Sequence, residues 1–205
     1  MKNINKYELI IFDLWQTLAD IQFRPFGRII EILGQDISIN NFIDKINKSD
    51  VFLKDEDIKV TLRNFLFTFN ANDKQIKNII ELWKKTALTT YLIEGAMDIL
   101  KRLKKQNKKL CLMTNIDKFG YEHFLHQELL DQFDYIFLSY KKGLAKPNLE
   151  CWNFIKKKFD IDFRKMIMIG DNIDIDITPA KKLGIKTIHI NNNEKSKKRI
   201  KYLLF

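Results

Sequence analysis

Five short apolar runs, separated by longer amphipathic segments, limit what this chain can fold into more than any other feature. Each run has four to six residues, many of them β-branched or aromatic: 7–12, 109–113, 135–138, 166–169 and 185–190. Such runs are typical of strands buried on both faces. Between the later runs lie segments with helical spacing: 95–106, 118–130, 147–159 and 175–183. Strands that alternate with helices predict an α/β fold, in which helices cover both faces of a parallel sheet.

The interval between the first and second runs has a different pattern. From about residue 21 to residue 88, apolar residues recur every three or four positions. This period predicts about four helices inserted between the first strand and the rest of the sheet. We therefore expect residues 1–19 and 91–205 to form an α/β core and residues 20–90 to form a helical cap.

Two residues mark the ends of predicted helices. Pro147 suits the first turn of a helix, and Gly184 is a good helix stop. The apolar residues 202–205 could add one more strand at the end of the chain.

The composition is that of a globular protein with a hydrophobic core. Of the 205 residues, 45% are hydrophobic. No apolar run approaches the ~20 residues that span a bilayer, and the first run is too short for a signal peptide. Two cysteines, Cys111 and Cys151, are too few to cross-link a scaffold of this size. We therefore expect a soluble, cytoplasmic protein with no membrane partner.

The net charge of +10 raises the question of a nucleic-acid partner. Only six of the 36 basic residues are Arg, whose planar guanidinium suits phosphate recognition better than the ammonium of Lys. The basic runs fall on predicted helix faces or near the end of the chain, where such charges are usually solvated. We therefore expect a small-molecule substrate and no nucleic-acid partner.

Four polar clusters follow or flank the predicted strands. They are Asp13 to Thr17, Thr114 with Asn115, Lys146, and Asp171 to Asp176. In an open parallel sheet, ligands bind beyond the carboxyl ends of the strands. The predicted fold would therefore bring an acid, a hydroxyl, an ammonium and a second acid into one crevice.

In this order the clusters resemble the four motifs of the haloacid dehalogenase-like hydrolase superfamily. The first motif, Asp-x-Asp-x-Thr, corresponds to residues 13–17, the second to Thr114, the third to Lys146, and the fourth to the Gly-Asp-x-x-x-x-Asp of residues 170–176. The resemblance covers the whole chain, including a helical insertion after the first motif. It implies a Rossmann-like parallel sheet with an α-helical cap that closes over the site.

The resemblance also implies catalytic roles. Asp13 would be the nucleophile that forms an ester intermediate, which divides one difficult displacement into two easier steps. Lys146 would offset the negative charges that meet in the site. Thr114 and Asn115 would bind the oxygens of the transferred group.

A Mg²⁺ ion is the cofactor that the resemblance implies. Asp13, Asp171 and the backbone carbonyl of Trp15 would hold it, because Mg²⁺ prefers oxygen ligands. Asp176 would either bind the ion through water or orient Lys146, and the sequence leaves both roles open.

Trp15 departs from the family pattern. Family phosphatases have an Asp there that protonates the leaving alcohol and later activates water. An indole cannot transfer protons at neutral pH, and the loss of general acid–base catalysis costs ~10²–10⁴ in rate.

Three functions therefore stay open. The first is a Mg²⁺-dependent phosphatase in which water or a cap residue transfers the protons. The second is a metal-independent 2-haloacid dehalogenase-type hydrolase, since halide leaves without a proton and such enzymes carry an aromatic residue at the position of Trp15. The retained Asp171 argues against this second function. The third is a protein that binds a ligand or partner without turnover.

Two arginines follow the first motif where the chain enters the predicted cap. Arg24 and Arg28 are spaced i, i+4, and either could bind a substrate carboxylate or phosphate through two hydrogen bonds. With Trp15 and Asn115, they are the candidate substrate-binding residues. Neither the identity of the substrate nor the oligomeric state can be inferred from the sequence.

Overall fold

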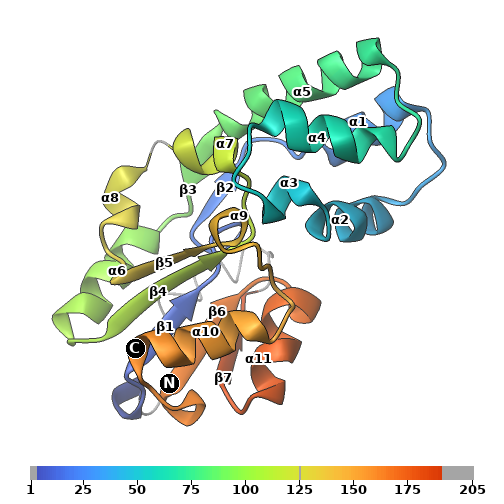
Figure 1. The fold of residues 1–205 in the computed structure, drawn as a ribbon. Helices are drawn as coiled ribbons and strands as arrows, with labels where there is room; N and C mark the ends of the chain where they lie inside the picture. The colour runs from blue at the N-terminus through green and yellow to red at the C-terminus, as the bar shows by residue number, and fades with distance from the viewer. Residues whose placement is uncertain (1–3, 125, 191–205) are drawn as a thin grey trace.

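The computed structural model describes residues 4–124 and 126–190, which contain a five-stranded parallel sheet (Figure 1). In spatial order the strands are β5 (Tyr135–Leu138), β4 (Lys109–Thr114), β1 (Leu9–Phe12), β6 (Met166–Gly170) and β7 (Lys186–His189). The five predicted strands are confirmed, with ends that differ by at most two residues. The strand expected at residues 202–205 lies outside the described residues.

Helices cover both faces of this sheet. One face packs against α6 (Ala96–Lys105) and α8 (Gln127–Leu130), and the other packs against α10 (Glu150–Phe159) and α11 (Thr178–Lys182). All four residues of β1 are fully buried, because this strand lies in the middle of the sheet with β4 and β6 on either side. Burial on both faces explains why the runs are continuously apolar rather than alternating.

Residues 26–87, between β1 and β4, form a helical layer beyond the carboxyl ends of the strands (Figure 1). We call its members the inserted helices: α1 (Phe26–Leu33), α2 (Ile39–Asn47), α3 (Asp50–Leu53), α4 (Ile58–Phe67) and α5 (Asp73–Ala87). Their apolar faces form a hydrophobic cluster separate from those of the sheet. The helices therefore pack mainly on one another.

The insertion differs from the prediction in two details. It has five helices instead of about four, because α3 adds a single turn that the apolar period did not indicate. It also begins and ends in a two-stranded antiparallel pair, β2 (Ala19–Ile21) and β3 (Thr90–Leu92). Three residues are too few to show the alternation by which strands are recognised.

The core differs from the prediction at Pro147. It was expected in the first turn of a helix, but α10 begins only at Glu150. The side chain of Asn115 forms hydrogen bonds with both backbone groups of Lys146, so this segment is tied to the end of β4. That tertiary contact explains why the chain does not enter the helix at Pro147.

The amphipathic segment 118–130 also differs, since it forms α7 (Lys118–Glu122) and α8 rather than one helix. Between the two, Nε2 of His126 lies 3.2 Å from the carbonyl oxygen of Thr90 at the start of β3. The helix stop at Gly184 is confirmed, since this residue directly follows Leu183, the C-cap of α11, and has a φ of 79°. Among the helices of the described residues, none has the length and apolar character of a membrane span.

Candidate active site

The four predicted polar clusters meet at the carboxyl ends of three neighbouring strands. Asp13 follows β1, Thr114 is the last residue of β4, and Asp171 follows β6. Lys146 lies between α9 (Ser139–Lys142) and α10, with only 2% of its surface exposed. Residues far apart in the sequence are thus brought into one site with little access to water.

Lys146 forms the centre of a buried network of charges. Its Nζ donates hydrogen bonds to Oδ1 of Asp13 and to Oδ1 of Asp176, each at 2.6 Å. The other oxygen of Asp176 accepts a hydrogen bond from the backbone N–H of Asn172 at 3.2 Å. Both oxygens of Asp176 are therefore engaged, and its contacts are those of a residue that orients Lys146.

Asn115 holds the loop that carries Lys146. Its Nδ2 donates to the carbonyl oxygen of Lys146 at 2.8 Å, and its Oδ1 accepts from the backbone N–H of Lys146 at 3.0 Å. Thr114 is buried beside it, and the Thr114 hydroxyl lies 3.5 Å from the carbonyl oxygen of Asn115. Asn115 lines the cavity described below, whereas Thr114 lies behind the cavity surface.

Gly170 is required by the close approach of Asp176. A Cβ atom at residue 170 would lie 2.5 Å from Oδ2 of Asp176, far inside van der Waals contact. The Gly of the fourth motif therefore makes room for the carboxylate that contacts Lys146.

Burial and charge change the acidity of these groups. Burial raises the pKa of Asp13 to about 8, although Lys146 acts to lower it. Burial and the neighbouring Asp176 raise the pKa of Asp171 to about 6. Burial lowers the pKa of Lys146, but Asp13 and Asp176 raise it more, so its pKa lies above the usual range and the ammonium stays protonated.

Three carboxylates could hold a metal ion here. One oxygen from each of Asp13, Asp171 and Asp176 lies within 4.8 Å of the other two. Carboxylate oxygens are ligands that Mg²⁺ prefers, and a divalent cation would favour the ionised forms of groups whose pKa burial has raised. The donor set therefore fits Mg²⁺, with Asp13 and Asp171 as the less engaged ligands.

Trp15 lies in a tightly curled loop that follows Asp13. The N–H groups of Leu18 and Ala19 both donate to the carbonyl oxygen of Leu14, at 2.9 and 3.0 Å, and Gln16 has a φ of 59°. The Trp15 ring packs edge-on against Phe124, with ring centroids 6.1 Å apart. The loop turns the chain back on itself, so that β2 starts beside Trp15.

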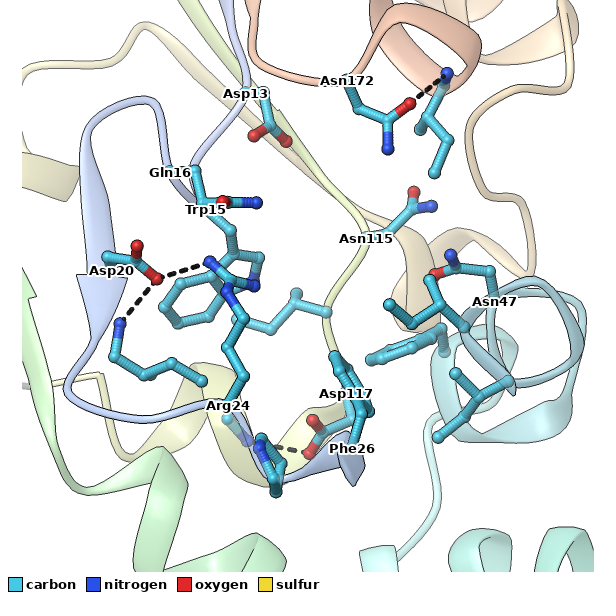
Figure 2. Close-up of a pocket in the computed structure, with 18 of the residues that line it drawn as sticks. Asp13, Trp15, Gln16, Asp20, Arg24, Phe26, Asn47, Asn115, Asp117 and Asn172 are labelled. Carbon is cyan, nitrogen blue, oxygen red and sulfur yellow. Dashed lines mark hydrogen bonds and ion pairs between the residues drawn. The ribbon is translucent and has the colours of Figure 1, made fainter. Parts of the chain in front are cut away.

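A cavity of about 230 Å³ connects this site with the inserted helices. Figure 2 shows Asp13 at one end, Phe26 and Asp117 at the other, and Asn115 and Asn172 across from Trp15. The inserted helices contribute mainly apolar side chains: Phe26, Ile43, Ile46, Phe52 and Trp83. One end of the cavity is therefore highly charged, and the other is largely apolar.

The two candidate arginines have different positions. Arg24 lines the cavity, and its Nη2 donates to Oδ1 of Asp20 at 2.8 Å. Its positive charge also acts to lower the pKa of Asp171. Arg28 instead pairs with Glu31 on the surface, with 61% of its side chain exposed. The structure brings Arg24 to the site and does not bring Arg28 there, because Arg24 precedes α1 whereas Arg28 lies within α1 and pairs with Glu31 of the same helix.

The sequence reasoning missed several cavity residues, among them Asp20, Asp117 and Asn172. Asp117 caps α7 and accepts a hydrogen bond from Nε1 of Trp83 at 3.2 Å, and Asn172 caps the π-helical turn η3 (Ile173–Ile177). Asp20 lies on β2. An Asp or Asn just before a helix is a sequence signal for a cap, but no local signal indicates that these side chains face a cavity.

Comparison with known proteins identifies a family. A model of the haloacid dehalogenase-like hydrolase family matches residues 7–184. A glyceraldehyde 3-phosphate phosphatase from Pyrococcus furiosus is 34% identical over 102 residues, which cover 48% of this chain and 42% of that protein. The chain spans less than half the length of the curated relatives it matches.

Solved structures share the fold over nearly the whole chain. A hydrolase of this type from Porphyromonas gingivalis has a TM-score of 0.69 and 17% identity, covering 97% of this chain and 98% of that chain. An enzyme from Bacteroides thetaiotaomicron, solved with magnesium and inorganic phosphate, has a TM-score of 0.61 and 20% identity, covering 92% and 96%. At these identities the likeness concerns the fold.

Proposed function

Because this chain belongs to the haloacid dehalogenase-like hydrolase family, we propose that it is a Mg²⁺-dependent phosphatase with Asp13 as its nucleophile. One observation carries the proposal: a buried Asp13 at the end of β1 contacts Lys146 and belongs to a three-carboxylate cluster that suits a divalent cation. The phosphatase names of several relatives support it.

The proposed chemistry begins with an attack by an Asp13 oxygen on phosphorus. The bond from Asp13 to phosphorus forms as the bond to the leaving oxygen breaks, and water later hydrolyses the aspartyl ester. Lys146 offsets the negative charge, and the backbone N–H of Asn115, which lies beside Thr114 in the cavity wall, would bind a phosphoryl oxygen. A Mg²⁺ ion held by Asp13, Asp171 and the carbonyl of Trp15 would supply further positive charge beside those oxygens.

The substrate we propose is a small phosphorylated metabolite. The cavity of about 230 Å³ is small for a ligand site, and the apolar side chains of the inserted helices line the end away from Asp13. Arg24 lies in the wall, where it would bind an anionic group of the substrate. Relatives named for glyceraldehyde 3-phosphate make small phosphorylated sugars and acids a sensible first panel.

We also propose that residues 20–90 act as a cap domain on a core of residues 1–19 and 91–205. The separate hydrophobic cluster of the inserted helices supports this division. A cap in this position would exclude water from the aspartyl ester and select the substrate.

A dehalogenase-type activity is the second candidate, and Trp15 is the observation that favours it. An aromatic residue at this position suits a leaving group that departs as halide. The retained carboxylate cluster of Asp13, Asp171 and Asp176 favours the metal-dependent phosphatase instead.

The test is release of p-nitrophenol from p-nitrophenyl phosphate with excess Mg²⁺, with wild type beside Asp13→Asn. This leaving group needs no proton, so the first step should survive the missing acid at residue 15. We expect release that depends on Mg²⁺ and disappears in Asp13→Asn. Activity that persists in Asp13→Asn would contradict the proposal, and metal-independent halide release from a short 2-haloacid would favour the second candidate.

A further inference from the structure

The proposed phosphatase needs a group that moves protons, and Trp15 cannot be that group. An alcohol must gain a proton as it leaves, and the water that hydrolyses the aspartyl ester must lose one. The cavity wall, as far as the described residues form it, contains no His, Cys, Tyr or Glu. Its acidic side chains are five aspartates: Asp13, Asp20, Asp117, Asp171 and Asp176.

Four of these five aspartates are already engaged, either in the carboxylate cluster or in structural hydrogen bonds. Asp13, Asp171 and Asp176 form the carboxylate cluster that fits the metal ion. Asp117 is 4% exposed, and both of its oxygens are engaged. Its Oδ1 accepts from the N–H of Gly120 at 2.9 Å, and its Oδ2 accepts from Nε1 of Trp83 at 3.2 Å. Asp20 is the aspartate that remains.

The curled loop brings Asp20 close to the position that lacks an acid. Trp15 and Ala19 form an isolated bridge, and the N–H of Gln16 donates to the carbonyl oxygen of Ala19 at 2.7 Å. Asp20 is the next residue of β2 after Ala19, so it lies one residue beyond this backbone contact with Trp15. Figure 2 shows Asp20, Trp15 and Gln16 on the same side of the cavity, with the Asp20 carboxylate directed at Arg24.

The Asp20 carboxylate is held in place and remains reachable by water. Its Oδ1 accepts from Nη2 of Arg24 at 2.8 Å and from the N–H of Ile21 at 2.9 Å. Within the described part of the chain, its Oδ2 has no hydrogen-bond partner. Its side chain is 20% exposed, unlike the deeply buried Asp13 and Asp176.

We propose that Asp20 is the general acid and base of this enzyme, in place of the residue that Trp15 replaces. The proposal rests on the phosphatase activity proposed above. In the hydrolysis step, a water oxygen bonds to phosphorus, Asp20 takes its proton, and the bond from phosphorus to Asp13 breaks. In the next turnover, Asp20 returns that proton to the leaving oxygen as the bond from phosphorus to that oxygen breaks. The sum is a phosphate ester and water giving an alcohol and inorganic phosphate.

The first experiment is a rapid-quench assay of wild type, Asp20→Asn and Asp131→Asn with p-nitrophenyl phosphate and Mg²⁺. Asp131 is an exposed aspartate that does not line the cavity, so its variant controls for the loss of one charge. We expect Asp20→Asn to release one equivalent of p-nitrophenol at the wild-type rate and then to turn over ~10²–10⁴ times more slowly. Intact-protein mass spectrometry should detect the trapped phosphoenzyme.

Two further readouts separate proton transfer from a structural role. With an alkyl phosphate, whose leaving group needs a proton, Asp20→Asn should lose the first step as well. The double variant Asp20→Asn/Trp15→Asp should recover turnover, because it places a carboxylate at residue 15. Formate should partly restore Asp20→Ala, because a small carboxylate can replace a missing base.

The outcomes distinguish this proposal from the proposed function. A wild type without Asp13-dependent phosphate release overturns the function itself. If wild type turns over and the turnover rate of Asp20→Asn is within about threefold of the wild-type rate, only the role of Asp20 is overturned. Equal losses of burst and turnover in a folded Asp20→Asn variant, with no rescue by formate in Asp20→Ala, also overturn that role.

Discussion

At the scale of single residues, the site is a set of buried charges that compensate one another. Lys146 contacts two carboxylates at 2.6 Å, and all three side chains are at most 9% exposed. Removing one partner from such a network typically costs about 3–5 kcal/mol, because it leaves a buried charge unpaired. The same network keeps Lys146 protonated beside Asp13, the proposed nucleophile. Stability and proposed chemistry therefore depend on the same contacts.

Gly170→Ala should disrupt this network without removing any charged group. The added Cβ would lie 2.5 Å from Oδ2 of Asp176 and force that carboxylate away from Lys146. We expect a loss of about 1–3 kcal/mol in the free energy of unfolding, measured by urea denaturation, and a lower kcat for p-nitrophenyl phosphate.

Gly27→Ala is the matched control for this substitution. Gly27 is the second residue of α1, and an added Cβ would meet only Cδ1 of Ile39 at an ordinary 3.8 Å. A glycine costs about 0.5–1 kcal/mol relative to alanine in a helix interior and less in the first turn, so this variant should keep or slightly exceed the stability of wild type. Equal stability changes in the two variants would contradict the role given to Gly170.

At the scale of elements, one buried hydrogen bond joins the inserted helices to the core. Trp83 of α5 donates to Asp117, which caps α7 through the N–H of Gly120. Burial raises the pKa of Asp117, while the hydrogen bonds from Gly120 and Trp83 act to lower it. Asp117 lies three residues after the end of β4, so this hydrogen bond positions α5 relative to the end of that strand.

Trp83→Phe should therefore lower the free energy of unfolding by more than the smaller ring alone would lower it. It leaves a buried acceptor on Asp117 without its donor, which costs about 1–3 kcal/mol. Trp152→Phe provides the comparison, since Nε1 of Trp152 is buried and has no partner in the described residues. Urea unfolding of both variants measures the difference, and equal losses would show that the Trp83 hydrogen bond contributes nothing.

At the scale of the whole molecule, stability should depend on pH through the carboxylate cluster. In the metal-free protein the pKa values of Asp13 and Asp171 are about 8 and about 6, against 3.8 for an ordinary aspartate. At pH values between 3.8 and these raised pKa values, the folded chain binds more protons than the unfolded chain. The free energy of unfolding therefore falls as pH rises from about 4 to about 8. Lys146 stays protonated in both states over this range and adds no slope.

Mg²⁺ should reverse this dependence, because it binds the ionised carboxylates. We expect the rise in Tm caused by Mg²⁺, relative to EDTA, to grow as pH increases from about 6 to about 8. Thermal melts across that range measure it, and Asp171→Asn should reduce the rise. A Tm rise that is the same at every pH would contradict the raised pKa values.

Helices and strands could be predicted from the sequence where nearby residues determine them, and could not where contacts with distant residues determine them. The five strands could be predicted because a buried strand needs a continuous apolar run, which the sequence shows directly. The break between α7 and α8 and the late start of α10 could not, because contacts of His126 with Thr90 and of Asn115 with Lys146 oppose the local helical pattern. Both contacts join residues more than 30 positions apart.

For this protein, the sequence by itself determined the strands, the helical insertion and the family, since these depend on apolar spacing and on which residues follow each strand. Tertiary structure alone decided which polar side chains share the cavity. Arg24 and Arg28 are equivalent candidates in the sequence, but only Arg24 lines the cavity, because Arg28 lies within α1 and pairs with Glu31 of the same helix. No local signal indicates that the side chains of Asp20 and Asp117 face the cavity, because the opposite walls of the cavity come from segments far apart in the sequence.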